Sequence, residues 1–282
     1  MSRLIRPFRL FLTAIAAVFC LASLHAIATQ PFSAWTMVVI GLCLIAVVGG
    51  VVLVVRRPDG AFLEPLVILL PGLVVGRLAS TAWLVPAGQA VPNVGRMTLG
   101  ETGPGLFRFE PLTLVLVAAV LLYVLAQAHR SISTRPTSPG LGATDWLAAI
   151  LRAYVGLMFI SHFTGHVLAG PIPFKAFVSL FGEIGMPFPA TSVVLAGLIE
   201  IVVCVGLAFG VLTRPIAVLG VVYLLIATWI GGHFGVGYSW GLQGDGWEFP
   251  ALWTSSIALF AIFGAGPISV DQTLSGKSRK RS

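Results

Sequence analysis

The amino-acid sequence predicts an all-α fold: a polytopic membrane helix bundle of about eight transmembrane helices, arranged in two halves of four. Of its 282 residues, 57% are hydrophobic and 10% are charged, whereas about a quarter of the residues in a soluble domain carry charge. Apolar runs of roughly 20 residues, the length that spans a bilayer, recur along the chain. Continuous runs such as 34 to 55 lack the alternation of a membrane barrel strand, so helices are the spanning structure that fits.

The apolar runs place the helices in order along the chain. In the first half we expect helices at 10 to 29, 34 to 55, 62 to 84 and 111 to 128. In the second half we expect them at 146 to 168, 190 to 212, 215 to 232 and 249 to 266. A segment rich in Ser, Thr, Pro and Gly separates the halves and is typical of a linker. The predicted regions are a four-helix membrane region at 1–130, a cytoplasmic linker at 131–145, a second four-helix bundle at 146–272 and a basic tail at 273–282.

The basic residues predict the orientation. Eight spans put both termini on one side, and 12 of the 17 Lys and Arg residues then lie at that face. The positive-inside rule makes this face cytoplasmic. Arg3, Arg6 and Arg9 precede a short apolar run ending in Ala26-Ile27-Ala28, which is similar to a secretory signal peptide. We favour an uncleaved first helix because the run approaches a full span; cleavage would leave seven helices with the same orientation.

Charge and cysteine spacing exclude two classes of function. The net charge is +7, but the basic residues lie singly or in pairs between apolar runs and do not line one surface. The sequence therefore predicts no nucleic-acid partner. Cys20, Cys43 and Cys204 lie one per apolar run, without C-x-x-C or zinc-ligand spacing. No dithiol redox motif and no metal site are predicted.

Charged residues inside the spans are the first functional candidates, because a charge at the centre of a membrane helix costs about 2.5–3.5 kcal/mol. Glu200 lies near the middle of the sixth predicted helix and needs a partner or a proton. The helical rise and the lean of side chains favour His162 over Arg152 as its nearer partner. Two interpretations remain open: a proton-handling role, or a structural ion pair or a carboxylic acid kept protonated by burial.

Histidines and an outer loop supply the other candidates. His162 and His166 are four residues apart and would share a helix face, which suits a metal, a proton relay or a quinone head group; ordinary hydrogen bonds between helices are the alternative. His233 and Gly244-Asp245-Gly246-Trp247-Glu248 lie outside in the same half, where a turn with an aromatic anchor is the alternative reading. The predicted catalytic residues are Glu200, His162 and His166, and the predicted substrate-binding residues are Arg152, His233, Trp247 and Glu248.

A set of short motifs runs through the second half in a fixed order. They are Arg152-x-x-x-Gly156-x-x-Phe159, Gly185-Met186-Pro187-Phe188-Pro189, Gly197-x-x-Glu200, Gly210-x-x-Thr213-Arg214, Gly246-Trp247-Glu248 and Gly264-x-Gly266-Pro267-x-Ser269-x-Asp271. By these motifs, residues 146 to 272 resemble the DoxX family of small four-helix membrane proteins, related to the DoxD subunit of thiosulfate:quinone oxidoreductase. The family often has Gly-x-x-Lys at the end of its first helix, whereas here His166 follows Gly165 and no lysine occurs. A role for that lysine does not carry over.

The resemblance implies a bacterial or archaeal inner membrane and an association with redox or sulfur metabolism. Our hypothesis is a membrane subunit or accessory of a quinone-linked redox system, with quinone as the candidate cofactor. Because the chain has no haem, flavin or iron-sulfur motif, its electrons must come from a redox partner protein. The alternative, from another class, is a non-enzymatic transporter of a small solute or metal, or an assembly factor. No motif specifies an oligomeric state.

Overall fold

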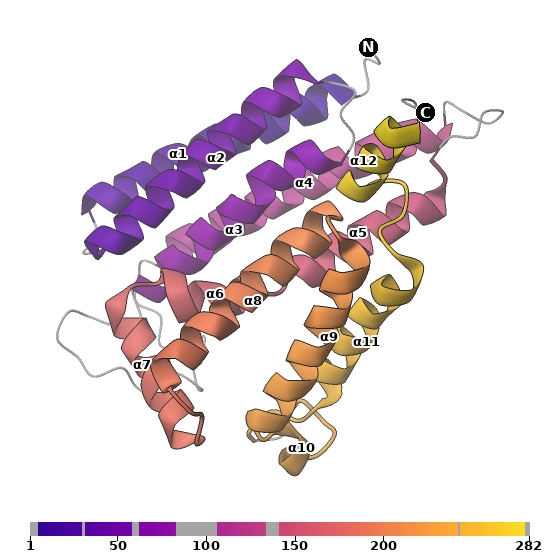
Figure 1. Cartoon of the computed structure of the whole chain (residues 1–282). Coiled ribbons are helices and arrows are strands. Elements are labelled where there is room, and N and C mark those ends of the chain that lie inside the picture. Colours follow the sequence, from indigo (N-terminus) through magenta and orange to yellow (C-terminus); the bar gives the residue numbers. More distant parts are fainter. Residues whose placement is uncertain are drawn as a thin grey trace. The chain divides into compact units, whose positions relative to one another are not determined.

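The structure is a computed structural model, which describes residues 5–29, 32–57, 62–82, 106–133, 141–241 and 243–279. Within these ranges every regular element is a helix (Figure 1). Residues 134–140 of the expected linker and the last three residues of the expected basic tail lie outside the described residues. The chain forms two compact units. Unit 1 comprises Met1–Gly142 and Ile160–Leu180, and unit 2 comprises Ala143–Phe159 and Phe181–Ser282.

Unit 1 is built on four long helices: α1 (Ile5–Thr29), α2 (Ala34–Arg56), α3 (Leu63–Ala82) and α4 (Leu106–Ser133). α2 packs on α3, and α4 packs on both α1 and α3. The same unit holds the short α6 (Ile160–Phe163) and the π-helical turn η2 (Thr164–Leu168), both of which contact α3. The amphipathic α7 (Pro171–Glu183) follows them.

Unit 2 is built on α5 (Ala143–Leu157), α8 (Pro189–Phe209), α9 (Thr213–Ile230) and α11 (Glu248–Phe263), with the short α10 (His233–Val236) and α12 (Val270–Arg279). α9 lies side by side with α11 and also packs on α8, while α5 packs on α8 and α11 (Figure 1). Four long helices therefore surround one core in this unit.

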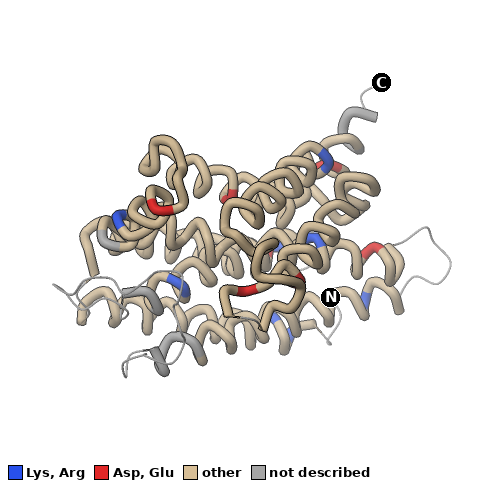
Figure 2. The backbone as a smooth tube through the Cα atoms, turned by 90° about the horizontal axis from the view of Figure 1, so that it is seen from below, with Lys and Arg blue, Asp and Glu red and all other residues tan. Residues whose placement is uncertain are grey.

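Length and polarity confirm a helical membrane bundle. Among the described residues, six helical segments are long and apolar enough to span a bilayer. They are α1, α2, Pro111–Ser133 of α4, the continuous stretch Ala143–Leu168, α8 and α9. The other two expected spans are the 20-residue α3, which contains Pro71, and the apolar α11 of 16 residues. Figure 2 shows how sparsely charged residues occur along the described backbone. Large apolar side chains such as Ile45 and Trp229 face outward, as lipid contact requires.

Helix ends differ from the predicted ones where the backbone overrides the apolar pattern. The apolar run at 190 to 212 continues through Val211 and Leu212, yet α8 ends at Phe209 because Gly210 adopts a left-handed conformation with φ of +68°. α11 also ends earlier than expected, at Phe263, because the following Gly264 has φ of +79° and ψ of −162°, outside the helical region. α4 is longer than predicted at both ends, and α7, α10 and α12 lie in segments where we predicted no helix.

The compact units cut through the fifth predicted span. Residues Ile160–Leu180 group with the N-terminal helices, so the expected bundle at 146–272 is shared between the units. Its boundary as a functional domain stays a prediction.

Candidate functional site

The Glu200 carboxylate is buried inside unit 2. Only 1% of the side chain is exposed, because Glu200 lies on the face of α8 that carries Val193, Gly197 and Val203 at helical spacing. The Tyr223 hydroxyl, on α9, donates a hydrogen bond to Glu200 Oε1. The core thus places a carboxylate, a proton acceptor, directly against a phenol, a proton donor.

Aromatic rings lie next to this hydrogen bond. The Phe159 ring, just after α5, lies 6.3 Å from the Tyr223 ring and 4.4 Å from the Trp253 ring of α11, measured between centroids. Trp253 Nε1 donates to the carbonyl of Val155 at 2.9 Å, which fixes the indole against α5. The Phe159 ring, itself packed on Trp253, therefore gives the Tyr223 phenol an apolar neighbour, and an electrostatic interaction in an apolar setting is stronger than in water.

Arg152 is fully buried on α5 and binds backbone carbonyls. Nε donates to Leu207 O at 2.8 Å, Nη2 donates to Ile268 O at 2.9 Å, and Nη1 donates to Ala265 O. Leu207 lies in the last turn of α8, and the other two carbonyls lie just beyond α11. The guanidinium thus donates to carbonyls at or just beyond the C-terminal ends of α8 and α11, which places its positive charge at the negative ends of the helix dipoles.

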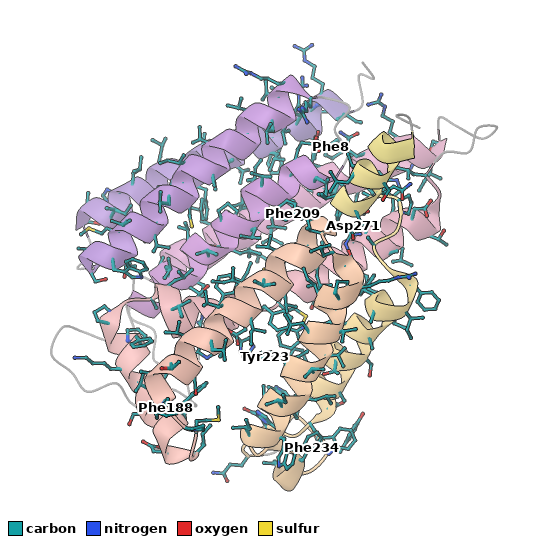
Figure 3. All side chains as sticks on the ribbon, viewed as in Figure 1. Phe8, Phe188, Phe209, Tyr223, Phe234 and Asp271 are labelled. Atoms are coloured by element: carbon teal, nitrogen blue, oxygen red, sulfur yellow. The ribbon has the colours of Figure 1, made fainter. Side chains whose placement is uncertain are left out.

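Asp271 ties the same end of unit 2 to α9. Its two carboxylate oxygens accept from Leu212 N at 2.7 Å and Thr213 N at 3.0 Å, so the side chain caps the start of α9. Asp271 N in turn donates to Gly210 O at 2.9 Å, next to the end of α8 at Phe209 (Figure 3). These contacts give several residues of the sequence motifs a structural reason. We call Arg152, Asp271 and the backbone groups that these two residues bind the inner lock. It lies at the end of unit 2 predicted to face the cytoplasm.

The opposite end of unit 2 brings the candidates of the outer loop together. The His233 ring stacks on Trp240 at 5.9 Å, and its Nδ1 is 2.6 Å from Asp245 O. Glu248 Oε2 accepts from Trp240 N at 3.2 Å. The Trp247 ring packs edge-on against Tyr238 and tilted against Phe234. His233, Trp247 and Glu248 therefore belong to one folded loop.

Gly246 makes this fold of the loop possible. Backbone bonds join Gly246 N to Ser239 O, Trp247 N to Gly237 O and Glu248 N to Tyr238 O. A Cβ at Gly246 would lie within 2.7 Å of the Gly237 and Tyr238 carbonyl oxygens. Only a glycine allows the two backbone segments to approach so closely.

His162 and His166 belong to unit 1 and differ in their surroundings. His162 on α6 is exposed, whereas His166 in η2 is buried, with its ring edge-on to Phe177 at 4.5 Å. The four-residue spacing predicts a shared face on an α-helix, but here Ala169 N donates to Thr164 O in a π-turn, which rotates the following side chains relative to an α-helix. Among the described residues, the buried Thr164 hydroxyl has no hydrogen-bond partner. Proximity of either histidine to Glu200 stays a prediction.

Sequence reasoning missed Tyr223 and Thr164. A tyrosine in the middle of a predicted apolar span was the available signal for Tyr223, since a buried phenol needs an acceptor. No local pattern marks Thr164, because its isolation follows from the π-turn. In the described part of the chain, no three His, Cys, Asp or Glu side chains lie together as a metal site.

Comparisons with known proteins place the family resemblance on the same segment. The DoxX family model matches residues 147–233, which include Arg152, Glu200 and Tyr223. The inner membrane protein YphA of Escherichia coli (strain K12) is 33% identical over 106 residues, which cover 35% of this chain and 72% of that protein. No solved structure matches the chain.

Proposed function

Since the chain belongs to the DoxX family, we propose that it is a multi-pass inner-membrane subunit of a quinone-linked redox system, in which Glu200 handles protons. Both termini face the cytoplasm in this proposal, and electrons come from a partner protein. The observation that carries the proposal is the Glu200 side chain itself, buried in the core of unit 2 and bound by the Tyr223 hydroxyl.

The chemistry of quinones motivates this assignment. Reduction of a quinone to a quinol takes up two protons with two electrons, so a quinone site inside a bilayer needs a group that can carry protons there. A carboxylic group at the middle of a membrane helix is costly and marks proton relays by default. The Tyr223 phenol is a donor in contact with this group, and a carboxylate with a phenol can pass a proton between them.

The remaining candidate residues take distinct roles in the proposal. His233, Trp247 and Glu248 share the outer loop, and we assign them to the entry of the head group from the outer side. We assign His162 and His166 to proton exchange at the outer side of the membrane, where the predicted topology places them. Arg152, which binds three carbonyls, acts by positioning the helices that carry Glu200 and Trp253.

The test compares cells that lack this chain with cells that carry wild-type or Glu200→Gln protein at equal abundance. Gln keeps the shape and accepts the Tyr223 hydrogen bond, but it cannot take up a proton. We expect the quinol-to-quinone ratio, measured after rapid extraction, to change in the null strain and to stay changed with Glu200→Gln. An unchanged ratio in the null strain would remove the quinone link, and a solute-dependent phenotype would then favour transport.

Arg77→Gln is the matched control. Arg77 lies in α3 of unit 1, after the small-residue pair Gly72 and Gly76, and we assign it a packing role. We expect its loss to lower protein abundance without a specific effect on the quinone ratio. Loss of the quinone effect at normal abundance in Arg77→Gln, with full activity of Glu200→Gln, would place the functional centre in unit 1.

A further inference from the structure

Ring side chains form one continuous series through unit 2, from the half-buried phenol of Tyr223 to the outer loop. In order they are Tyr223, Phe159, Trp253, Phe249, Trp240 and His233. The successive centroid distances are 6.3, 4.4, 5.9, 5.2 and 5.9 Å. No centroid distance between neighbouring rings exceeds 6.3 Å, so each ring lies close to the next one in the series.

Packing alone accounts for such distances, since aromatic pairs prefer centroids roughly 4.5–7 Å apart. The order of residue types in the series also suits electron transfer. Tyr223, Trp253 and Trp240 are of the two side-chain types that give up an electron most readily among aromatic residues, and one phenylalanine lies between each successive pair. Trp240 is 40% exposed at the outer loop, whereas Trp253 and Phe159 are buried and Tyr223 is half-buried against the buried Glu200. The series therefore connects solvent to the core.

The Tyr223 end of the series has the proton acceptor that oxidation of a tyrosine requires. A phenol that loses one electron becomes a strong acid, so its proton must go to a base within hydrogen-bond reach. Glu200 Oε1 already accepts the hydrogen bond of the Tyr223 hydroxyl. Proton transfer along this bond needs no movement of either side chain.

We propose that this series is an electron path, along which Tyr223 reduces a radical of the thiyl or peroxyl class that meets Trp240 at the outer loop. The radical gains one electron and becomes the corresponding thiolate or hydroperoxide anion. Tyr223 loses that electron through Trp253 and Trp240, its O–H bond breaks, and the proton moves to the Glu200 carboxylate. The products in the protein are a neutral tyrosyl radical and a protonated Glu200. The proposal depends on the ring contacts and the phenol–carboxylate bond, and it does not require the quinone-linked function.

The experiment isolates Tyr223 as the reporter. The chain has four tyrosines, so changing Tyr123, Tyr154 and Tyr238 to Phe leaves Tyr223 alone. The full chain in lipid nanodiscs is oxidised by flash-quench with water-soluble ruthenium(III) tris(bipyridine), which stands for the radical. Transient absorption and electron paramagnetic resonance then follow the tyrosyl radical.

We expect a neutral tyrosyl radical in the background variant and none after the further change Tyr223→Phe. Trp240→Phe and Trp253→Phe should each slow tyrosyl formation at least tenfold, because each removes a relay site. Glu200→Gln should abolish the neutral radical, since no base accepts the proton. Trp146→Phe is the control, because Trp146 is a buried tryptophan of α5 outside the series; its rate should not change.

Two results would overturn the proposal. The first is the absence of a tyrosyl radical in the folded background variant, with folding checked by circular dichroism. The second is a rate of formation that neither Trp240→Phe nor Trp253→Phe changes. Trp253→Phe also loses the hydrogen bond to Val155 O, so the Trp240 variant guards against a folding effect. A quinone ratio that is unchanged in the null strain leaves this outcome untouched, so the two proposals fail separately.

Discussion

Replacing Arg152 with Lys tests whether the inner lock holds unit 2 together. Lysine keeps the positive charge but loses the planar fork, so one ammonium cannot donate along the three directions that the guanidinium serves. Arg152 is fully buried, and its partners are the carbonyls of Leu207, Ala265 and Ile268. Water cannot replace the lost donors at these positions.

The expected magnitude follows from the number of bonds lost. A hydrogen bond from a charged donor contributes about 1.5–3 kcal/mol. If the ammonium keeps one or two of the three bonds, the loss is about 1.5–6 kcal/mol, which brackets the roughly 3–5 kcal/mol found when one partner of a buried ion pair is removed. We expect Arg152→Lys to lower the free energy of unfolding by about 3 kcal/mol.

The assay is reversible unfolding by sodium dodecyl sulfate in mixed micelles, followed by tryptophan fluorescence. Arg214→Lys is the matched control: Arg214 is exposed at the same end of unit 2, and we expect a change within about 0.5 kcal/mol. A loss below about 1 kcal/mol in Arg152→Lys would refute the lock. It would return Arg152 to the substrate-binding role predicted from the sequence.

Further predictions address the lock, the loop and the topology. Gly210→Ala should destabilise unit 2 by about 1–3 kcal/mol in the same assay, because φ is +68° and the added Cβ would lie 2.9 Å from Arg152 Cζ. Gly246→Ala should speed amide hydrogen exchange in the outer loop, since the added Cβ would push its backbone segments apart; unchanged exchange would contradict the close approach. A reporter fused after Ser282 should be cytoplasmic and one inserted near Gly100 external, and the opposite pattern would reverse the orientation. Intact-mass measurement should find residues 1 to 28 present, whereas a mass beginning at residue 29 would indicate a cleaved signal peptide.

The helices were predictable because their signal is local and strong. An apolar run of span length has one solution in lipid, so the eight expected runs each contain helix in the structure. The ends were less predictable, because α8 stops where Gly210 turns left-handed although the following residues remain apolar. The η2 turn was not predictable from the helical spacing of apolar residues. A π-turn adds one residue to a helical turn without changing the composition of the segment.

The candidate site was predictable in its residue types and less so in its partners. The insertion cost singled out Glu200, and it is buried as expected. Its hydrogen bond to Tyr223 depends on how α9 is rotated against α8, and the positions of the apolar spans in the sequence do not determine that rotation. The substrate-binding role predicted for Arg152 stays a prediction, and the carbonyl partners of its guanidinium come from residues more than 50 positions away. Such contacts follow from tertiary packing of helix ends.

Reaction-induced infrared difference spectroscopy tests the central claim most directly, namely that Glu200 changes its protonation state when the system turns over. The membranes contain the protein with its native partners, and the quinone pool is switched electrochemically between oxidised and reduced. The account predicts a protonated-carboxyl C=O band that appears with the switch, shifts in D₂O, is absent in Glu200→Gln and moves in frequency in Tyr223→Phe. A band that persists in Glu200→Gln, or a wild-type spectrum without a carboxyl band, would contradict it.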